Sequence, residues 1–199
     1  MFLLSIDIDN ALAYLQSQLQ EMGLWNRTNL IISSDHGHHD IDYDKIVYIE
    51  DYVDKEQFVW KEPNFWPIGC RVEDLMEKLK LMPHCKVFQR QQLADRGYSK
   101  HSRIGPIVVI PEEGGQILSS RSIDGAKFDM KSAHVYDHQH PSMWPLFVAT
   151  GPKFKQNFEL QIQDPLHLVD VAGIAAKCLS IKLESTDSVP DRYLKLFKN

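Results

Sequence analysis

The chain has 199 residues, 43% of them hydrophobic, which is enough for one domain with a core of its own. Its formal net charge of −5 excludes the basic surplus that draws proteins to nucleic acids and anionic membranes, and we expect no nucleic-acid-binding surface. No apolar run approaches the ~18 residues needed to span a bilayer. Asp7 and Asp9 interrupt the first apolar residues, so we expect no signal peptide in this chain.

The N-terminal third of the chain predicts one helix and one strand. Apolar residues spaced three and four apart predict a helix over residues 9–22, with Asp9 or Asn10 as its N-cap. Residues 29–34 contain an unbroken apolar run and predict a short, fully buried strand. Residues 41–70 show no clear periodicity, and we expect them to form loops.

The rest of the chain alternates between helical and strand-like patterns. Helical spacing of Val72, Leu75, Met76 and Leu79 predicts a second helix that ends before Pro83. A last helix is predicted to open at Asp164, followed by a proline at the first helical position. Strands are predicted at residues 86–88, 107–110 and 146–149, and residues 119–133 are expected to be a loop.

Helices that alternate with short, uniformly apolar strands are typical of one fold class. They predict an α/β fold whose mostly parallel central sheet is flanked by helices. In such sheets ligands bind beyond the carboxyl ends of the strands. Polar residues that follow a predicted strand are therefore the first candidates for a functional site.

Such a polar segment, residues 33–40 with the sequence SSDHGHHD, follows the strand at residues 29–34. Clustered charge at this position is costly unless a metal or a substrate uses it. The carboxylate of Asp35 and the imidazole of His36 suit Zn²⁺, but they make up only half of a tetrahedral shell. A second histidine-rich segment, residues 133–140, can face the first across a crevice. The alternatives for the two segments are a turn with a helix-cap acid and a solvated polar loop.

Four stretches of the sequence resemble, in order, motifs of one known family. They are Asp-x-Ala-Leu-x-Tyr-Leu at residues 9–15, the segment NLIISSDHG at residues 29–37, Tyr-x-x-x-x-Arg-Ile-x-Pro-Ile at residues 98–107, and residues 134–154, which run from His-x-Tyr-Asp through Ser-Met to Gly-Pro-x-Phe. The chain thereby resembles the ectonucleotide pyrophosphatase/phosphodiesterase family of the alkaline phosphatase superfamily.

The resemblance implies an alkaline phosphatase-like fold, of which residues 1–199 would be the C-terminal half of a single catalytic domain. It also implies two zinc ions that clamp an in-line phosphoryl transfer. Asp35 and His36 would hold one ion and His134 the other, with the remaining ligands in the absent N-terminal half. The family's threonine nucleophile is also expected there, because no threonine of this chain stands in a matching context.

The activity implied is hydrolysis of phosphodiester or pyrophosphate bonds of nucleotides through a phospho-threonine intermediate. The alternatives are a phosphodiesterase for choline phospholipids and a non-catalytic family member. The partner is then a small-molecule phosphodiester, and we expect the chain alone to be inactive. The family is extracellular or held at the cell surface, with any membrane anchor in absent segments. In that setting the sequon at Asn26 would be glycosylated.

Three positions depart from the family's motifs. Val135 replaces a glycine, so a positive backbone φ at this residue would be strained. His138 replaces an asparagine and, with His140, is a candidate substitute contact. His38 replaces the methionine after Asp-His-Gly, and we expect His38 and His39 to be exposed neighbours of the site rather than ligands.

Overall fold

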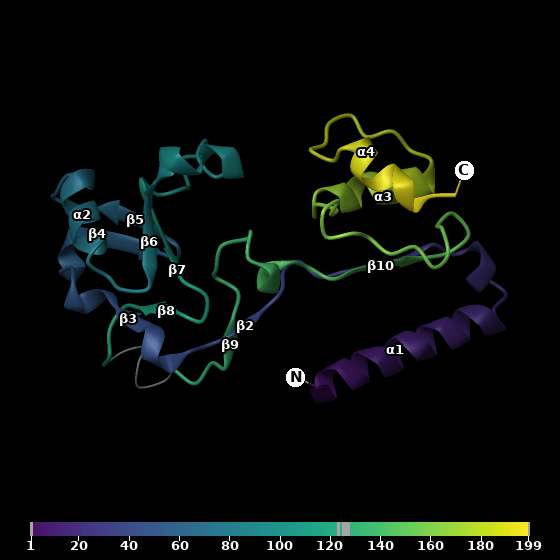
Figure 1. The fold of residues 1–199 in the computed structure, drawn as a ribbon, viewed down its shortest axis with the longest axis horizontal. Coiled ribbons are helices and arrows are strands. Elements are labelled where there is room, and N and C mark those ends of the chain that lie inside the picture. Colours follow the sequence, from purple (N-terminus) through teal and green to yellow (C-terminus); the bar gives the residue numbers. More distant parts are fainter. Residues whose placement is uncertain (1, 123, 125–127, 199) are drawn as a thin grey trace. The chain divides into compact units, whose positions relative to one another are not determined.

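The computed structural model describes residues 2–122, 124 and 128–198. The chain forms two compact units, one of residues 1–35 with 145–199 and one of residues 36–144 (Figure 1). Each unit contains helices and strands, which confirms the predicted α/β class. Short 3₁₀ helices occur at Trp25–Arg27, Tyr43–Lys45, Ile49–Asp51, Lys55–Gln57, Arg90–Arg96, Pro141–Met143 and Leu194–Leu196.

In the first unit, one pair of strands connects the N-terminal segment of the chain with the C-terminal segment. Strand β1 (Leu30–Ser33) pairs antiparallel with β10 (Phe147–Thr150). Its helices are α1 (Phe2–Glu21), α3 (Asp170–Leu179) and the short α4 (Pro190–Tyr193). The core of this unit consists of Phe154, Ile174, Tyr193, Leu196 and Phe197.

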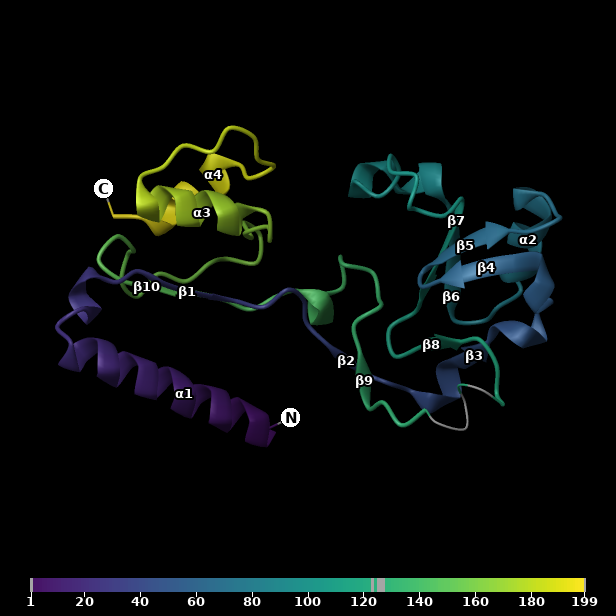
Figure 2. The same ribbon diagram turned by 180° about the vertical axis from the view of Figure 1, so that it is seen from behind.

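The second unit is built around a four-stranded antiparallel sheet. Its order is β4 (Phe58–Lys61), β5 (Asn64–Pro67), β7 (Ile107–Pro111) and β6 (Cys85–Gln89). Helix α2 (Val72–Leu79) lies beside this sheet (Figure 2) and buries Leu75, Met76 and Leu79 in the same core as Phe65 and Ile107. The unit also contains two further strand pairs. Strand β3 (Ile46–Tyr48) pairs with β8 (Gln116–Leu118), and β2 (His39–Asp40) pairs with β9 (Ser132–Ala133).

The prediction of a mostly parallel sheet is wrong for the strands that the structure describes. Only β3 and β8 run parallel, and every other described pair is antiparallel. One reason is local, because β4 and β5 are joined by a connection of two residues, Glu62 and Pro63. So short a connection permits only an antiparallel hairpin.

The predictions are confirmed for strands β6, β7 and β10 and for helix α2. Four other expectations need correction. Residues 41–70 are not loops, since they contain β3, β4 and β5. Helix α1 begins before the predicted caps Asp9 and Asn10, which lie inside it. Strand β1 is only partly buried. Within the expected loop 119–133, Ser132 and Ala133 form β9, while residues 123 and 125–127 lie outside the described part.

The last helix also begins later than predicted, at Asp170 instead of after Asp164. The carboxylate of Asp164 forms an ion pair with Lys195 and does not cap a helix. The carboxylate of Asp170 accepts a hydrogen bond from the backbone N–H of His167 at 2.9 Å.

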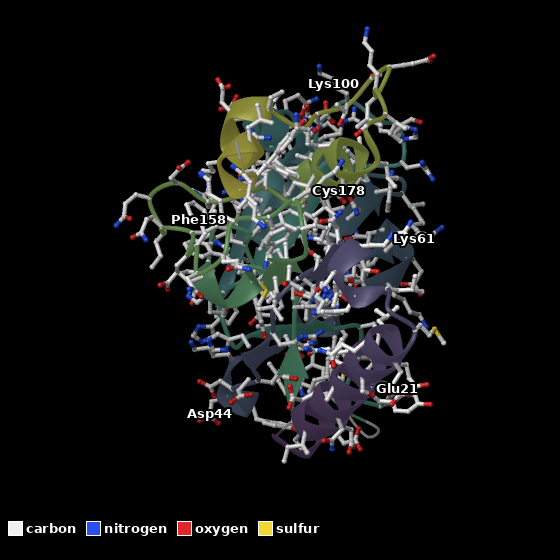
Figure 3. The ribbon with its side chains drawn as sticks, turned by 90° about the vertical axis from the view of Figure 1, so that its right-hand side faces the viewer. Glu21, Asp44, Lys61, Lys100, Phe158 and Cys178 are labelled. Atoms are coloured by element: carbon white, nitrogen blue, oxygen red, sulfur yellow. The ribbon has the colours of Figure 1, made fainter. Side chains whose placement is uncertain are left out.

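Large apolar side chains of the first unit are exposed. The exposed fractions are 62% for Ile8, 68% for Tyr14 and 43% for Phe158, whose side chain lies at the periphery in Figure 3. Among the described helices, none combines the length and the apolar character that a membrane crossing requires.

Candidate metal centre

The two histidine-rich segments meet through the strand pair β2 and β9 of the second unit. In this antiparallel pair His39 stands opposite Ala133 and Asp40 opposite Ser132. Continuing the register by one residue sets His38 opposite His134. Side chains at opposite positions of an antiparallel pair start from Cβ atoms about 5 Å apart. The backbone pairing therefore brings together histidines from distant parts of the sequence.

Three imidazoles form one compact cluster at this end of the strand pair. The rings of His36 and His134 are stacked, with centroids 3.8 Å apart and an interplanar angle of 16°. The ring of His38 lies 5.2 Å from each of the other two. One nitrogen from each residue can be chosen so that all three lie within 4.8 Å of one another. His36 is half-buried, and His38 and His134 are exposed.

Gly37 lets the chain between two of these histidines pass close to another segment. Its N–H donates to the carbonyl of Met143 at 3.0 Å, and a Cβ added to it would lie 2.0 Å from the carbonyl oxygen of Ser142. His140 caps the short helix at residues 141–143, since its Nδ1 accepts from the N–H of Ser142 at 3.3 Å. No residue with a side chain fits at position 37 without moving this segment.

The orientation of His36 follows from a hydrogen bond of its ring. Nδ1 lies 2.9 Å from the carbonyl oxygen of Gly37. A carbonyl oxygen can only accept, so Nδ1 carries the proton and Nε2 carries the lone pair of the neutral ring. Metal-ligating histidines commonly use a backbone carbonyl in this way to fix the tautomer.

A small core supports the cluster, with buried Ile41, Ala133, Tyr136 and Met143. Val135, the residue that replaces the family's glycine, packs against this core with a partly buried side chain. Its backbone is not among the described residues with positive φ. The strain that a β-branched residue would suffer at positive φ therefore does not arise, and the replacement is compatible with the fold.

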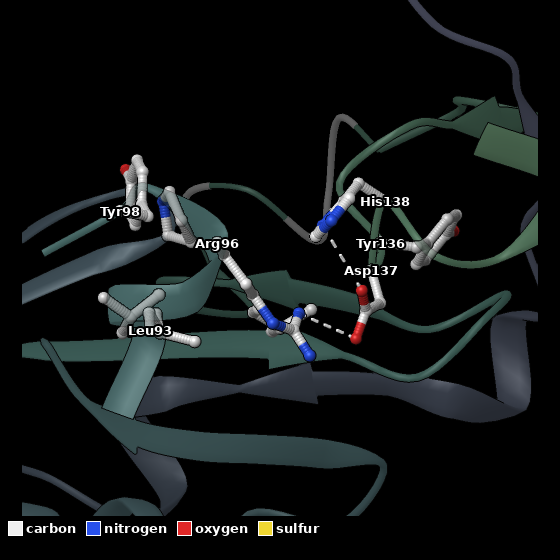
Figure 4. Close-up of a pocket in the computed structure, with 9 residues that line it drawn as sticks. Leu93, Arg96, Tyr98, Tyr136, Asp137 and His138 are labelled. Carbon is white, nitrogen blue, oxygen red and sulfur yellow. Dashed lines mark ion pairs between the residues drawn. The ribbon is translucent and has the colours of Figure 1, made fainter. Parts of the chain in front are cut away.

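The loop after His134 is held by an ion pair. Asp137 lies 2.8 Å from Arg96, and Nδ1 of His138 lies 3.5 Å from the same carboxylate (Figure 4). Burial raises the pKa of Asp137, but the N–H of Gln139 and the guanidinium of Arg96 outweigh it, so the net pKa lies below the ordinary value. Arg96, Asp137 and His138 line a cavity of about 180 Å³ together with Leu93 and Tyr98. His138, a candidate substitute contact, thus lies against Asp137.

The structure brings together two of the three predicted ligands, His36 and His134. Asp35, the third, is exposed and is the last residue of the first unit before the chain passes to His36. His38 was expected to be an exposed neighbour, and it is exposed, yet it belongs to the three-histidine cluster. The His-x-His spacing of His36 and His38 could have indicated this, because alternate residues of an extended chain face the same side.

Comparison with known proteins identifies the family to which the chain belongs. Residues 5–138 match the family model of type I phosphodiesterase / nucleotide pyrophosphatase. The chain belongs to this family, as the four motifs predicted.

The curated relatives that match this chain are longer than it. It is 31% identical over 168 residues to human ectonucleotide pyrophosphatase/phosphodiesterase family member 5, an alignment that covers 81% of the chain and 34% of the relative. It is 32% identical over 182 residues to the bis(5′-adenosyl)-triphosphatase of Xenopus laevis, covering 88% and 38%. The chain therefore spans about a third of the length of these relatives.

Solved structures support the alkaline phosphatase-like architecture. The human family member 5 superposes with a TM-score of 0.87 at 28% identity, covering 97% of the chain and 51% of that structure. An inactive variant of the murine protein in complex with AMP gives a TM-score of 0.83 at 26% identity, covering 96% and 51%.

Proposed function

We propose that residues 1–199 are the C-terminal half of the catalytic domain of a zinc-dependent phosphodiesterase that hydrolyses phosphodiester or pyrophosphate bonds of nucleotides. One observation carries this proposal, the stacked pair of His36 and His134 in a cluster of three imidazoles. Family membership supports the reaction class, and the superposition on about half of each solved relative supports the partial domain.

Nucleotides are the favoured substrates over choline phospholipids. Relatives of this chain include a bis(5′-adenosyl)-triphosphatase, and a murine relative has been solved in complex with AMP. A non-catalytic role is the remaining alternative, and it predicts that the protein does not hydrolyse nucleotides when zinc is added. The retained imidazole pair favours the enzyme, because a purely structural module has no need of it.

The donor atoms fit zinc. Imidazole nitrogens are among the preferred ligands of Zn²⁺, and a carboxylate such as that of Asp35 completes such sets. In the proposed site Asp35 and His36 hold one ion and His134 contributes to the second. When bound, a pair of zinc ions stabilises the attacking and leaving oxygens of an in-line phosphoryl displacement. This chain's own part is to orient the ligands.

Three features of the second unit hold the ligands in that orientation. The carbonyl of Gly37 fixes the tautomer of His36, so that Nε2 keeps the lone pair that a metal ion would use. The β2–β9 register fixes the backbone on which His134 stands. The ion pair of Asp137 with Arg96 holds the loop that follows. A ligand side chain that is already held in place loses little conformational entropy when the metal ion binds.

The nucleophile is proposed to be a threonine of the absent half. The three threonines of the chain, Thr28, Thr150 and Thr186, all lie in the first unit, outside the unit that holds the cluster. The hydroxyl of Thr28 donates to the carbonyl of Leu24 at 3.0 Å. The inactive murine variant in complex with AMP carries a threonine-to-alanine substitution, which supports a catalytic threonine in that relative.

We further propose that the protein acts outside the cell or at its surface. Asn26, the sequon residue, is exposed within the short helix at residues 25–27 and is accessible for glycosylation.

The test is nucleotide hydrolysis by the longer protein of which this chain is proposed to be part. With zinc we expect it to cleave a bis-adenosyl triphosphate, and we expect His36→Asn and His134→Asn to lower kcat/KM at least a hundredfold. His167→Asn, an exposed histidine of the first unit, is the control and should leave the rate unchanged. Full activity after chelation, or in both site variants, would contradict the proposal. So would zinc-dependent turnover of the nitrophenyl ester of thymidine monophosphate by the 199-residue chain alone.

A further inference from the structure

A pocket of about 460 Å³ in the first unit has no part in the proposed reaction. It is lined by Trp25 and Asn26 of the short helix before β1, by residues of the turn and loop that follow β10, and by Lys198 near the end of the chain. All of these residues belong to the first unit, whereas the histidine cluster belongs to the second. Sites for small molecules have volumes of about 300–1,000 Å³, so the pocket is large enough for a ligand of its own.

Backbone contacts hold the walls of this pocket in place. Strand β1 pairs with β10 directly beside it. The N–H of Lys153 donates to the side-chain oxygen of Asn29 at 3.1 Å. The N–H of Lys155 donates to the carbonyl of Leu196 at 2.8 Å, and the N–H of Lys198 donates to the carbonyl of Lys153 at 3.0 Å. The pocket is therefore already formed without a ligand, and a ligand has little backbone to order when it binds.

The lining of the pocket suits a sugar. Trp25 is half-buried, and an indole offers a flat apolar face for stacking together with one N–H donor. The exposed amides of Gln156 and Asn157 can both donate and accept hydrogen bonds, and the ammonium groups of Lys155 and Lys198 can donate. A pyranose ring with hydroxyl and acetamido groups has an apolar face for the first kind of contact and polar atoms for the second.

One wall of the pocket is also the sequon asparagine. Asn26 is followed by Arg27 and Thr28, which makes it the acceptor of an N-linked glycan. We propose that the glycan carried by Asn26 lies in this pocket, with its first N-acetylglucosamine stacked on Trp25. The inference rests on the proposed location outside the cell or at its surface, where a glycosylated protein is found.

The covalent attachment makes weak contacts sufficient. A ligand joined to the chain by a short flexible link has an effective concentration of about millimolar at a neighbouring site. Asn26 needs no long link, because it lines the pocket itself. The bound sugar would then connect the short helix before β1 with the segment after β10.

The experiment measures how fast peptide N-glycosidase releases the glycan from the folded chain. The full chain is secreted from eukaryotic cells behind an added signal peptide, so glycosylation does not depend on where the natural protein acts. We expect mass spectrometry to find the glycan on Asn26. A sugar that lies in the pocket shields the bond that the glycosidase cuts, and Trp25→Leu and Gln156→Ala should each speed its release at least threefold. Gln156 is exposed, so its variant tests the contact even where Trp25→Leu does not fold.

The matched control moves the glycan out of the pocket. In the Asn26→Gln chain, Glu184→Asn creates a sequon with Ser185 and Thr186 at exposed residues that do not line the pocket. The glycan at position 184 should be released at least tenfold faster than the glycan at Asn26, and the two rates should be equal in urea. Equal rates in the folded chains, unchanged release in the folded pocket variants, or no glycan on Asn26 would overturn the inference. None of these results would affect the proposed hydrolysis of nucleotides.

Discussion

The imidazole rings of His36 and His134 are stacked with their centroids 3.8 Å apart, although they come from opposite ends of the second unit's sequence. The pairing of β2 with β9 brings their segments together. A divalent metal ion binds the unprotonated nitrogen of each ring, and rings that already lie close together need little rearrangement when metal ions bind.

Gly37→Ala should disrupt this arrangement. The added Cβ would lie 2.0 Å from the carbonyl oxygen of Ser142, a backbone atom that cannot move away alone. Overpacking of this kind costs about 2 kcal/mol of unfolding free energy. Urea unfolding measures the loss, and zinc affinity should fall with it.

Gly69→Ala is the control for the glycine substitution. A Cβ at this position has no heavy atom within 4 Å, and the φ of +64° makes backbone strain its only cost. That strain is about 1 kcal/mol. Zinc affinity should stay unchanged in Gly69→Ala, and unchanged affinity in Gly37→Ala would contradict the role given to the glycine.

Asp170→Ala should strongly destabilise the first unit. The carboxylate is 0% exposed and makes two hydrogen bonds of 2.7 Å to Arg192. It also accepts from the N–H of Val189 at 3.0 Å. Removing one partner of a buried pair leaves the other charge uncompensated, which costs about 3 kcal/mol. Asp164→Ala breaks the pair of a largely exposed carboxylate with Lys195 and should cost less than about 1 kcal/mol.

Stability should fall as the solution becomes acidic. The pKa of Asp137 lies below its ordinary value, because two hydrogen bonds and the charge of Arg96 outweigh its burial. A carboxyl whose pKa is lower in the folded chain stabilises the fold above its unfolded pKa of about 3.9. This contribution is lost as the pH falls from there through the folded pKa.

Urea unfolding of the chain at several pH values measures this loss. The unfolding free energy should be nearly constant above about pH 5 and decrease toward pH 3. Asp137→Asn should be less stable than the unmodified chain at pH 7, and the difference should shrink at pH 3. A difference that is the same at both pH values would show that the charge of Asp137 is not responsible.

The thiol of Cys85 should resist alkylation. Burial, with a smaller effect of Glu112, raises its pKa to about 12, so little thiolate exists at pH 8. Labelling with iodoacetamide followed by mass spectrometry should show slow modification of Cys85 in the folded chain. The rate should rise to that of an ordinary cysteine in urea. Rapid labelling of Cys85 without denaturant would contradict the burial that the structure shows.

Local patterns in the sequence were enough to predict the elements with strong periodicity. Helix α2 forms where it was predicted and ends before Pro83, because the spacing of its apolar residues matches one helical face. Strand β7 follows from an unbroken apolar run that ends at a proline. In contrast, β4 and β5 were missed, since the exposed Lys61 and Glu62 and the following proline obscure the alternation of Phe58 and Trp60.

The candidate site was predictable in part. The motifs identified His36 and His134, but the sequence alone does not fix the register of two short strands such as β2 and β9. That register decides whether His38 faces His134 or solvent. The cap assigned to Asp164 failed for a similar reason, because its partner Lys195 lies far along the chain. Non-local pairings of this kind leave no periodic trace in the sequence.

Anomalous X-ray scattering at the zinc absorption edge tests the metal site most directly. Crystals of the longer protein of which this chain is proposed to be part are grown with zinc and measured above and below the edge, and the difference locates the ions. We predict one peak within bonding distance, about 2 Å, of a nitrogen of His36 and a second peak at the same distance from a nitrogen of His134. A peak that lies only at other histidines, or no peak at this cluster in zinc-saturated crystals, would contradict the proposed metal centre.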